Sequence, residues 1–290
     1  MCTEQGKLFD TTDWDILIVL DAVRYDKMYE LAHIFNQDFS ITKAKSPATC
    51  TFSWVLEIFE DRYYNDVIFV SGHRWISSDG PRDEKLLVYR ERLKYSKRLL
   101  NFDPREHFKK IIDVWKYGYE DKYKTTSPYT MANEIIRISK ENPNNRIMSK
   151  FSQIHTPYIY YLQKEGHEKE IESEVESRRL QYDNLYNFIG FFLNDELLTK
   201  LRVKFGIPPK YGMMKYWLDY GREGIIKGYM EDLELTLKCI KKIVDEFPEK
   251  TIAITADHGE RLGERKKYSH AGRHDKIVTT VPWLILNGGN

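Results

Sequence analysis

The 290-residue sequence has few cysteines and no long apolar run. Cys2, Cys50 and Cys239 are far apart and odd in number, so neither a disulfide framework nor a CxxC metal site can be built from them. No stretch approaches the roughly 20 apolar residues that a membrane-spanning helix needs. Residues 1–13 are polar and lack the basic and apolar regions of a signal peptide. We therefore expect a cytoplasmic protein without a membrane span.

The sequence also lacks an excess of charge of either sign. Its 45 Lys and Arg residues stand against 44 Asp and Glu residues, which gives a formal net charge of +1. Because nucleic-acid-binding proteins usually carry a clear basic excess, we expect no nucleic-acid partner. Hydrophobic residues make up 41% of the chain and the mean hydropathy is −0.58, a composition typical of folded globular proteins. Nothing in the sequence indicates an oligomeric state.

Short apolar runs rich in β-branched residues alternate with segments of helical spacing along most of the chain. The runs predicted as strands are 15–20, 66–70, 146–154, 251–255 and 281–286. The segments predicted as helices are 22–35, 53–61, 84–100, 128–140, 170–198 and 228–246. Such alternation is typical of a mostly parallel sheet with helices on both faces. We therefore predict a three-layer α/β/α sandwich.

Residues 160–224 interrupt this alternation. The segment is charged and helical at first, then carries the break Gly206-Ile-Pro-Pro209 and the aromatic stretch from Tyr211 to Tyr220. We interpret it as a helical insertion or cap within a single domain that spans residues 1–290. Its aromatic side chains would suit a sugar or lipid head group above the active site, but core packing explains the same residues equally well.

Side chains suited to metal or proton chemistry follow four of the predicted strands. They are Asp21, His73, His155 and the pair Asp257-His258. Ligands of parallel sheets bind beyond the carboxyl ends of the strands. Asp257 and His258 can both reach one divalent ion where Gly259 lets the backbone turn sharply, and Asp21 can add a third ligand. For the pair alone, a helix cap and a packed histidine would be an equally good interpretation.

These segments resemble the metal-binding segments of the alkaline phosphatase and sulfatase superfamily, particularly its archaeal and viral sulfatase-like members. Residues 19–26, VLDAVRYD, are similar to the first segment, and residues 253–264, AITADHGERLGE, to the second. His270 resembles the histidine that follows the second segment, and residues 155–158 the His-x-Pro-Tyr element. The resemblance implies an alkaline-phosphatase-like fold with a helical insertion. It also implies a hydrolase or transferase that acts on phosphate or sulfate esters.

The resemblance further implies a nucleophile at the start of a helix. The loop from Ser46 to Trp54 reads SPATCTFSW, and the Ser-Pro-x-x-x-Thr pattern of the family places the nucleophile at Thr51. The helix N-terminus and a metal ion would both stabilise an alkoxide there. Cys50 is the alternative nucleophile. However, Phe52 and Trp54 replace the Pro and Arg of the sulfatase Cys-x-Pro-x-Arg motif, which speaks against conversion of Cys50 to formylglycine.

By the same resemblance, one or two divalent ions (Mn²⁺, Zn²⁺, Mg²⁺ or Ca²⁺) would be held by Asp21, Asp257, His258 and Thr51. His155 and His270 would bind the ester oxyanion or protonate the leaving group, and His73 would contact the substrate. The substrate would be a small-molecule or head-group ester. Whether water or a second alcohol releases the group stays open. The alternative function is a catalytically degenerate binding or regulatory module with the same fold.

Overall fold

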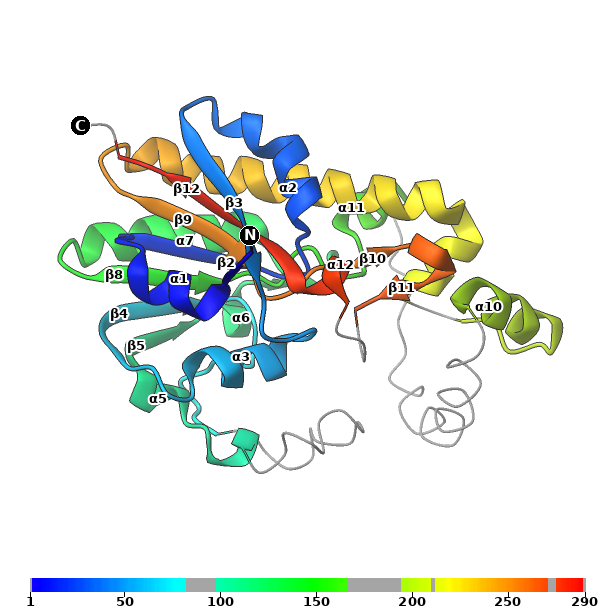
Figure 1. Ribbon diagram of the computed structural model, residues 1–290, viewed down its shortest axis with the longest axis horizontal. Helices are drawn as coiled ribbons and strands as arrows, with labels where there is room; N and C mark the ends of the chain where they lie inside the picture. Colours follow the sequence, from blue (N-terminus) through cyan, green and yellow to red (C-terminus); the bar gives the residue numbers. More distant parts are fainter. Residues whose placement is uncertain (1, 82–97, 166–193, 210–211, 271–274, 289–290) are drawn as a thin grey trace.

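The computed structural model describes residues 2–81, 98–165, 194–209, 212–270 and 275–288. Its centre is an eight-stranded sheet in the order β1-β3-β12-β9-β2-β8-β4-β5 (Figure 1). The strands are β1 (Thr3–Glu4), β2 (Ile16–Leu20), β3 (Phe39–Lys45), β4 (Tyr64–Ser71), β5 (Phe108–Asp113), β8 (Arg146–Lys150), β9 (Ile252–Ala256) and β12 (Thr280–Leu286). Two small two-stranded sheets, β6 (Tyr119–Glu120) with β7 (Thr125–Thr126) and β10 (Arg261–Leu262) with β11 (Tyr268–Ser269), accompany it.

One strand of the main sheet runs against the others. β12 is antiparallel to its neighbours β3 and β9, whereas every other neighbouring pair is parallel. The mostly parallel sheet predicted from the sequence is therefore confirmed. Every residue of β2 and of β9 is buried, because helices cover both faces of these strands. Their unbroken apolar runs follow from this double coverage.

Helices form a layer on each side of the sheet (Figure 1). The helices α2 (Tyr25–Leu31), α7 (Pro128–Glu141) and α11 (Met213–Glu246) pack together on one face. On the other face lie α1 (Gln5–Thr11) and α3 (Thr51–Phe59). The remaining described helices with printed bounds are α5 (Pro104–His107), α6 (Val114–Tyr117), α8 (Ile159–Glu165), α10 (Asp195–Lys204) and α12 (Lys276–Thr279). The predicted three-layer arrangement is confirmed.

A buried aromatic cluster fixes α3 against the sheet. The ring centroid of Phe9 lies 6.0 Å from that of Trp54 and 5.6 Å from that of Trp283. The indole N–H of Trp54 also donates to Gln5 Oε1 at 2.8 Å. Full burial of one such ring stabilises the fold by about 1.5–3 kcal/mol. Because Trp54 is held in this way, the start of α3 at Thr51 has a fixed place relative to the sheet.

Two of the longer strands of the main sheet, β3 and β5, were not predicted from the sequence. β5 was missed, and β3 was missed because its burial pattern has only Ala44 buried, so no apolar alternation marks it. Backbone pairing with β12 defines β3 instead. The predicted helix at 22–35 is divided into α2 and a 3₁₀ turn, η1 (Ala32–Phe35). Most of the predicted helices at 84–100 and 170–198 lies outside the described residues, although residues 98–101 are helical.

The predicted insertion is described in part. Residues 166–193 and 210–211 lie outside the described ranges, and α8, α10 and the first turns of α11 make up the rest. The 34-residue helix α11 continues past residue 224. The predicted end of the insertion at residue 224 therefore lies inside this helix. A break at Gly221, with φ at 68°, divides the helix. In the described ranges we find no helix with both the length and the apolarity to cross a bilayer.

Candidate active site

Four neighbouring strands of the sheet carry the candidate site. β9, β2, β8 and β4 lie side by side and point the same way, so their carboxyl ends share one edge. Asp21 follows β2, and Asp257 follows β9, where its backbone N–H donates to Leu20 O at 3.1 Å. Parallel pairing thus brings together two carboxylates that are more than 200 residues apart in the chain.

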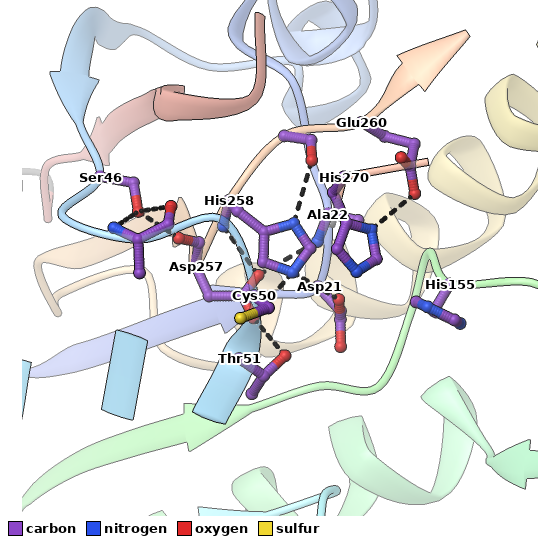
Figure 2. Close-up of polar contacts among 12 residues, drawn as sticks. Asp21, Ala22, Ser46, Cys50, Thr51, His155, Asp257, His258, Glu260 and His270 are labelled. Carbon is purple, nitrogen blue, oxygen red and sulfur yellow. Dashed lines mark hydrogen bonds and ion pairs between the residues drawn. The ribbon is translucent and has the colours of Figure 1, made fainter. Parts of the chain in front are cut away.

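Asp21, Asp257 and His258 form a compact group of possible metal ligands. One ligand atom from each lies within 4.8 Å of the others, and all three residues are buried. His258 Nε2 lies 3.6 Å from Asp21 Oδ1 and 3.6 Å from Asp257 Oδ2. Figure 2 shows the three side chains converging from two strand ends. The structure therefore brings the predicted metal ligands together.

The polar atoms of this group fit a divalent cation. His258 Nδ1 lies 3.0 Å from Gly259 O, which can only accept, so Nδ1 carries the proton and Nε2 presents a lone pair. Burial lowers the pKa of His258 and so favours this neutral form. Among the described residues neither Asp21 Oδ1 nor His258 Nε2 has a hydrogen-bond partner. Buried acceptors without partners are unfavourable, and a bound cation would satisfy both.

Thr51 lies beside this group as the first residue of α3. Its hydroxyl is buried and donates to Asp257 Oδ2 at 2.7 Å. The Sγ of Cys50, the N-cap residue, lies 3.0 Å from Ser53 Oγ. The Ser46 hydroxyl donates to the backbone carbonyl of Asp257, which ties the loop before α3 to the end of β9. Of the two nucleophile candidates, Thr51 is therefore the one seen bonded to the ligand group.

Several contacts fix the Asp257 carboxylate. Its Oδ1 accepts from the backbone N–H of Ala22 at 3.1 Å and of His258 at 2.9 Å. Burial disfavours the charged form, but the Lys150 ammonium group, the Thr51 hydroxyl and the backbone N–H of Ala22 hold the pKa of Asp257 below its usual range. Ala22 itself has a φ of 59°, in the left-handed region that non-glycine residues rarely adopt. The backbone next to Asp21 is therefore strained at the place where it meets Asp257.

Gly259 is needed for a different reason than the sequence suggested. Its φ lies outside the left-handed region, so no special turn requires a glycine. A Cβ at this position would instead lie 2.5 Å from the backbone oxygen of Ile277, at the start of α12. The Gly259 N–H donates to Val278 O at 2.6 Å. The expected sharp turn is therefore replaced by a close approach of two backbone segments.

His270 and Glu260 face each other across the β10–β11 hairpin. His270 Nδ1 lies 3.0 Å from Glu260 Oε2. Although burial opposes the charged imidazole, Glu260 outweighs it and raises the pKa of His270 to about 9. The His270 ring centroid lies 4.1 Å from that of His258 and 5.4 Å from that of His155 (Figure 2). The predicted histidines therefore gather around the ligand group.

His73 lies in the loop after β4 and is half-buried. Its Nδ1 accepts from the backbone N–H of Trp75 at 3.3 Å. Burial and the Lys150 ammonium hold the pKa of His73 well below its usual range, with a smaller opposing effect of Asp257. His73 is thus neutral and close enough to feel the charges of the site. Its contact with the substrate stays a prediction.

Lys150 is the site residue that the sequence interpretation missed. It is only 2% exposed, and its Nζ lies 3.3 Å from Asp21 Oδ2 and 3.3 Å from Asp257 Oδ2. Lys150 is the last residue of β8 and pairs with Val19 in β2. In the sequence Lys150 lies inside the predicted strand 146–154, and only the earlier end of β8 in the structure places it at the edge where ligands bind.

The aromatic residues of the predicted cap pack largely on one another. The ring centroids of Tyr161 and Tyr220 lie 4.2 Å apart and are stacked, and those of Tyr158 and Tyr216 lie 5.4 Å apart. Tyr158 and Tyr161 are buried, whereas Tyr216 and Tyr220 are partly exposed. Core packing therefore accounts for the first two. Tyr211 lies outside the described residues.

Comparison with known proteins supports the fold. No family model and no curated protein matches the sequence. The solved integral membrane protein lipooligosaccharide phosphoethanolamine transferase A from Neisseria meningitidis is similar over 93% of this chain, with a TM-score of 0.50 and 12% identity. This chain has the fold of that transferase. It spans 46% of the length of the transferase, and the identity is low enough that the likeness concerns the fold alone.

Two further solved structures are similar. The C-terminal periplasmic domain of phosphoethanolamine transferase EptC from Campylobacter jejuni matches 99% of this chain and 83% of its own, at 15% identity and a TM-score of 0.48. The phosphonate monoester hydrolase of Agrobacterium radiobacter matches 94% of this chain and 68% of its own, at 15% identity and a TM-score of 0.46. The predicted fold is supported by the sheet order of this chain and by the first of the three structures, and the residue roles stay predictions.

Proposed function

We propose that this chain is a metal-dependent enzyme that transfers or hydrolyses a phosphoester group through a covalent intermediate on Thr51. One observation carries the proposal. The Thr51 hydroxyl donates to Asp257, and that carboxylate belongs to a buried ligand group in which Asp21 Oδ1 and His258 Nε2 have no partner among the described residues. A nucleophile candidate and two acceptor atoms without a described hydrogen-bond partner thus occur in one place.

The chemistry follows from the positions of these side chains. A divalent ion held by Asp21, Asp257 and His258 would lower the pKa of the Thr51 hydroxyl and offset charge on the ester oxygens. Thr51 Oγ1 forms a bond to phosphorus as the ester P–O bond breaks, and the hydroxyl proton, which is held against Asp257 Oδ2 in the free site, passes to solvent. His270, oriented by Glu260, protonates the departing ester oxygen.

A second displacement step releases the phosphoryl group from Thr51. Water or a second alcohol attacks phosphorus, the bond to Thr51 Oγ1 breaks, and Thr51 regains a proton. His155, whose ring centroid lies 5.4 Å from that of His270, would accept the proton of the incoming water or alcohol. Water makes the reaction a hydrolysis, and an alcohol makes it a transfer.

The class of substrate rests on the fold comparison. The N. meningitidis protein is named for phosphoethanolamine transfer. On this ground a phosphodiester with a head-group alcohol is the first substrate class to test, ahead of a sulfate ester. The histidine in the ligand group favours Mn²⁺ or Zn²⁺ over Mg²⁺ or Ca²⁺.

The alternative is a non-catalytic binding module, and one observation favours it. Lys150 contacts both carboxylates of the ligand group, so part of the negative charge is already neutralised by the protein. In that case the site would hold an anionic ligand without breaking an ester bond. Metal content and turnover distinguish the two functions.

The test is turnover of bis-p-nitrophenyl phosphate, p-nitrophenyl phosphate and p-nitrophenyl sulfate with added Mn²⁺, Zn²⁺, Mg²⁺ or Ca²⁺. We expect metal-dependent release of p-nitrophenol that Thr51→Ala lowers at least about a thousandfold, as for other nucleophile deletions. Cys50→Ala is the matched control, since it changes the adjacent residue and should keep most of the activity. Mass spectrometry after substrate addition should find the phosphoryl adduct on Thr51.

Two results would contradict the proposal. Full activity in Thr51→Ala together with loss in Cys50→Ala would move the nucleophile to Cys50. Absence of turnover and of bound metal in the purified protein would favour the binding module.

A further inference from the structure

We propose that Gln5 is a positioning residue for Thr51, because its side chain joins the first turn of α3 to the last residue of β9. This role rests on the proposed function, since it assumes that Thr51 attacks the ester beside Asp257. It goes beyond that function by assigning a task to a residue of α1, which lies outside the ligand group. Nothing in the sequence interpretation pointed to Gln5.

The Gln5 amide group is bonded through its oxygen and through both of its protons. Oε1 accepts from the indole N–H of Trp54 at 2.8 Å, while Nε2 donates to Ala256 O at 2.7 Å and to Thr255 Oγ1 at 2.8 Å. An indole N–H can only donate, so it fixes which end of the amide group is the oxygen. The side chain therefore has one orientation, with α3 on one side and β9 on the other.

Burial keeps this link intact. Gln5 and Trp54 are both buried, so water cannot replace a lost bond of the amide group. One helical turn further along α1, Phe9 packs against the Trp54 ring with a centroid distance of 6.0 Å. On the face of the sheet that they share (Figure 1), α1 thus contacts α3 through a hydrogen bond and through an aromatic ring.

The link through Gln5 lies next to the bond that Thr51 itself makes. Trp54 lies one helical turn after Thr51, and the last residue of β9 directly precedes Asp257. The start of α3 and the end of β9 are therefore joined twice, directly by the Thr51 hydroxyl donating to Asp257 at 2.7 Å and indirectly through Gln5. One hydrogen bond leaves rotation of α3 about its own axis open, whereas two attachments one turn apart oppose it.

Another contact between this region and β9 does not reach the helix. The Ser46 hydroxyl donates to Asp257 O, but Ser46 lies in the loop before α3. Between them Cys50, the N-cap residue, has an extended backbone with φ at −158° and ψ at 153°. Ser46 thus holds the loop, whereas Gln5 holds the helix that begins at Thr51.

For the reaction, the consequence is the direction of Thr51 Oγ1. In-line attack depends on this direction, and a misplacement of about 1 Å can lower a rate by about 100-fold. Gln5 would act on the attack through Trp54 and Ala256, and not on the binding of the ester. Loss of the link should therefore lower kcat and leave KM nearly unchanged.

The test compares Gln5→Met and Trp54→Phe with the wild type in steady-state kinetics on the preferred ester. Gln5→Met keeps the length of the side chain and removes its hydrogen bonds, and Trp54→Phe keeps an aromatic ring and removes the N–H. Trp14→Phe is the matched control. The buried Trp14 indole also donates a hydrogen bond, to Phe9 O at 3.3 Å, but Trp14 precedes β2, at the opposite end of that strand from the site. All rates are measured well below the thermal midpoint of each variant.

We expect kcat to fall by about 10–100-fold in Gln5→Met and in Trp54→Phe, with KM changed by less than about twofold. The double variant should be slower than the slower single variant by no more than about twofold, since both substitutions break the same link. Trp14→Phe should keep its kcat although it loses a buried hydrogen bond. If Gln5→Met does not fold, the comparison of Trp54→Phe with Trp14→Phe decides the claim.

Three results would overturn the role of Gln5 and leave the proposed function standing. They are a wild-type kcat in Gln5→Met and Trp54→Phe, an equal loss of kcat in Trp14→Phe, and losses that multiply in the double variant. Absence of turnover in the wild type would instead overturn the proposed function. A crystal structure of Gln5→Met or Trp54→Phe then decides the inference by itself. A Thr51 hydroxyl still bonded to Asp257 would overturn it, and a displaced hydroxyl would support it.

Discussion

Glu260 Oε2 lies 3.0 Å from His270 Nδ1 because two short strands pair in one register. Arg261 is opposite Ser269 in the β10–β11 ladder, so the residue before one strand faces the residue after the other. The carboxylate accepts from Nδ1–H and leaves Nε2 of His270 as the nitrogen that is available to a ligand. Glu260 is accordingly a positioning residue for His270.

Removing this partner should lower activity without removing the site. We expect Glu260→Ala to reduce kcat by about 10–100-fold, the range seen when the partner of an active-site histidine is lost. Glu260→Gln should retain more activity, since its amide oxygen can still accept from Nδ1. Steady-state kinetics of both variants on the preferred ester provides the measurement. Unchanged kcat in both would show that the orientation of His270 does not depend on Glu260.

Gly259 should tolerate no side chain. A Cβ there would lie 2.5 Å from the backbone oxygen of Ile277, which cannot move aside as a flexible side chain can. Gly259→Ala should therefore lower the free energy of unfolding by about 1–3 kcal/mol, as overpacking does. Thermal or denaturant unfolding provides the measurement.

Gly6→Ala is the matched control for that substitution. The nearest atom to its added Cβ, at 2.8 Å, is Arg62 Nη2, the far end of a flexible side chain, and Gly6 lies within α1. Alanine is favoured over glycine in helices by about 1 kcal/mol, so this variant should be as stable as the wild type or slightly more stable. Equal stability of the two alanine variants would contradict the close-approach argument.

Asp232 should make stability fall as the pH rises toward neutrality. Its carboxyl group lies in α11 and accepts from the backbone N–H groups of Ile159 and Tyr160 at 2.7 and 2.8 Å. Burial outweighs these bonds and raises the pKa of Asp232 to about 7. The unfolded carboxyl group titrates near pH 4, so between about pH 4 and 7 only the folded state keeps the proton.

The contribution is therefore fully present below about pH 4 and is lost as the pH rises through about 7. Asp232→Asn cannot ionise, so the unfolding free energy of the wild type minus that of the variant should fall from pH 5 to pH 8. Denaturant unfolding at several pH values checks this. Asp245→Asn, on the same helix but exposed and paired with Lys241, controls for the loss of a carboxylate. A wild-type minus variant value that rises with pH would contradict the assignment.

Metal removal should lower the thermal midpoint. An ion that binds only the folded state stabilises it by about 2.7 kcal/mol at 100 times its Kd. We expect chelator to lower the midpoint and added Mn²⁺ or Zn²⁺ to restore it in the wild type. His258→Ala should abolish this response, whereas His33→Ala, which removes an exposed imidazole of η1, should retain it. A full response in His258→Ala would place the ion elsewhere.

The ends of the central strands were predictable because burial on both faces leaves an unmistakable apolar run. The runs before Asp21 and Asp257 stop where the strands stop, and parallel order then puts both residues at one edge. Thr51 was found differently, from the resemblance of its loop to a family pattern. Its bond to Asp257 depends on the packing of α3, which no local pattern reports.

Lys150 and β3 show what local patterns cannot predict. A lysine usually indicates an exposed position, and its burial here depends on two carboxylates from strands that are distant in sequence. β3 is largely exposed and becomes a strand only through pairing with β12, which comes much later in the chain. Both features arise from tertiary contacts, so no local hydrophobic pattern in the sequence marks either of them.

The sheet order also governs when the site can exist during synthesis. β2 is synthesised before its two neighbours in the sheet, β8 and β9, which follow it by more than 120 and 230 residues. A nascent chain that has not yet made β9 contains Asp21, Thr51 and Lys150 but lacks Asp257 and His258. Under the proposed function such a chain could neither bind the ion nor act on an ester. The non-local pairing that slows folding would then keep the emerging polypeptide inactive until β2 is enclosed on both sides.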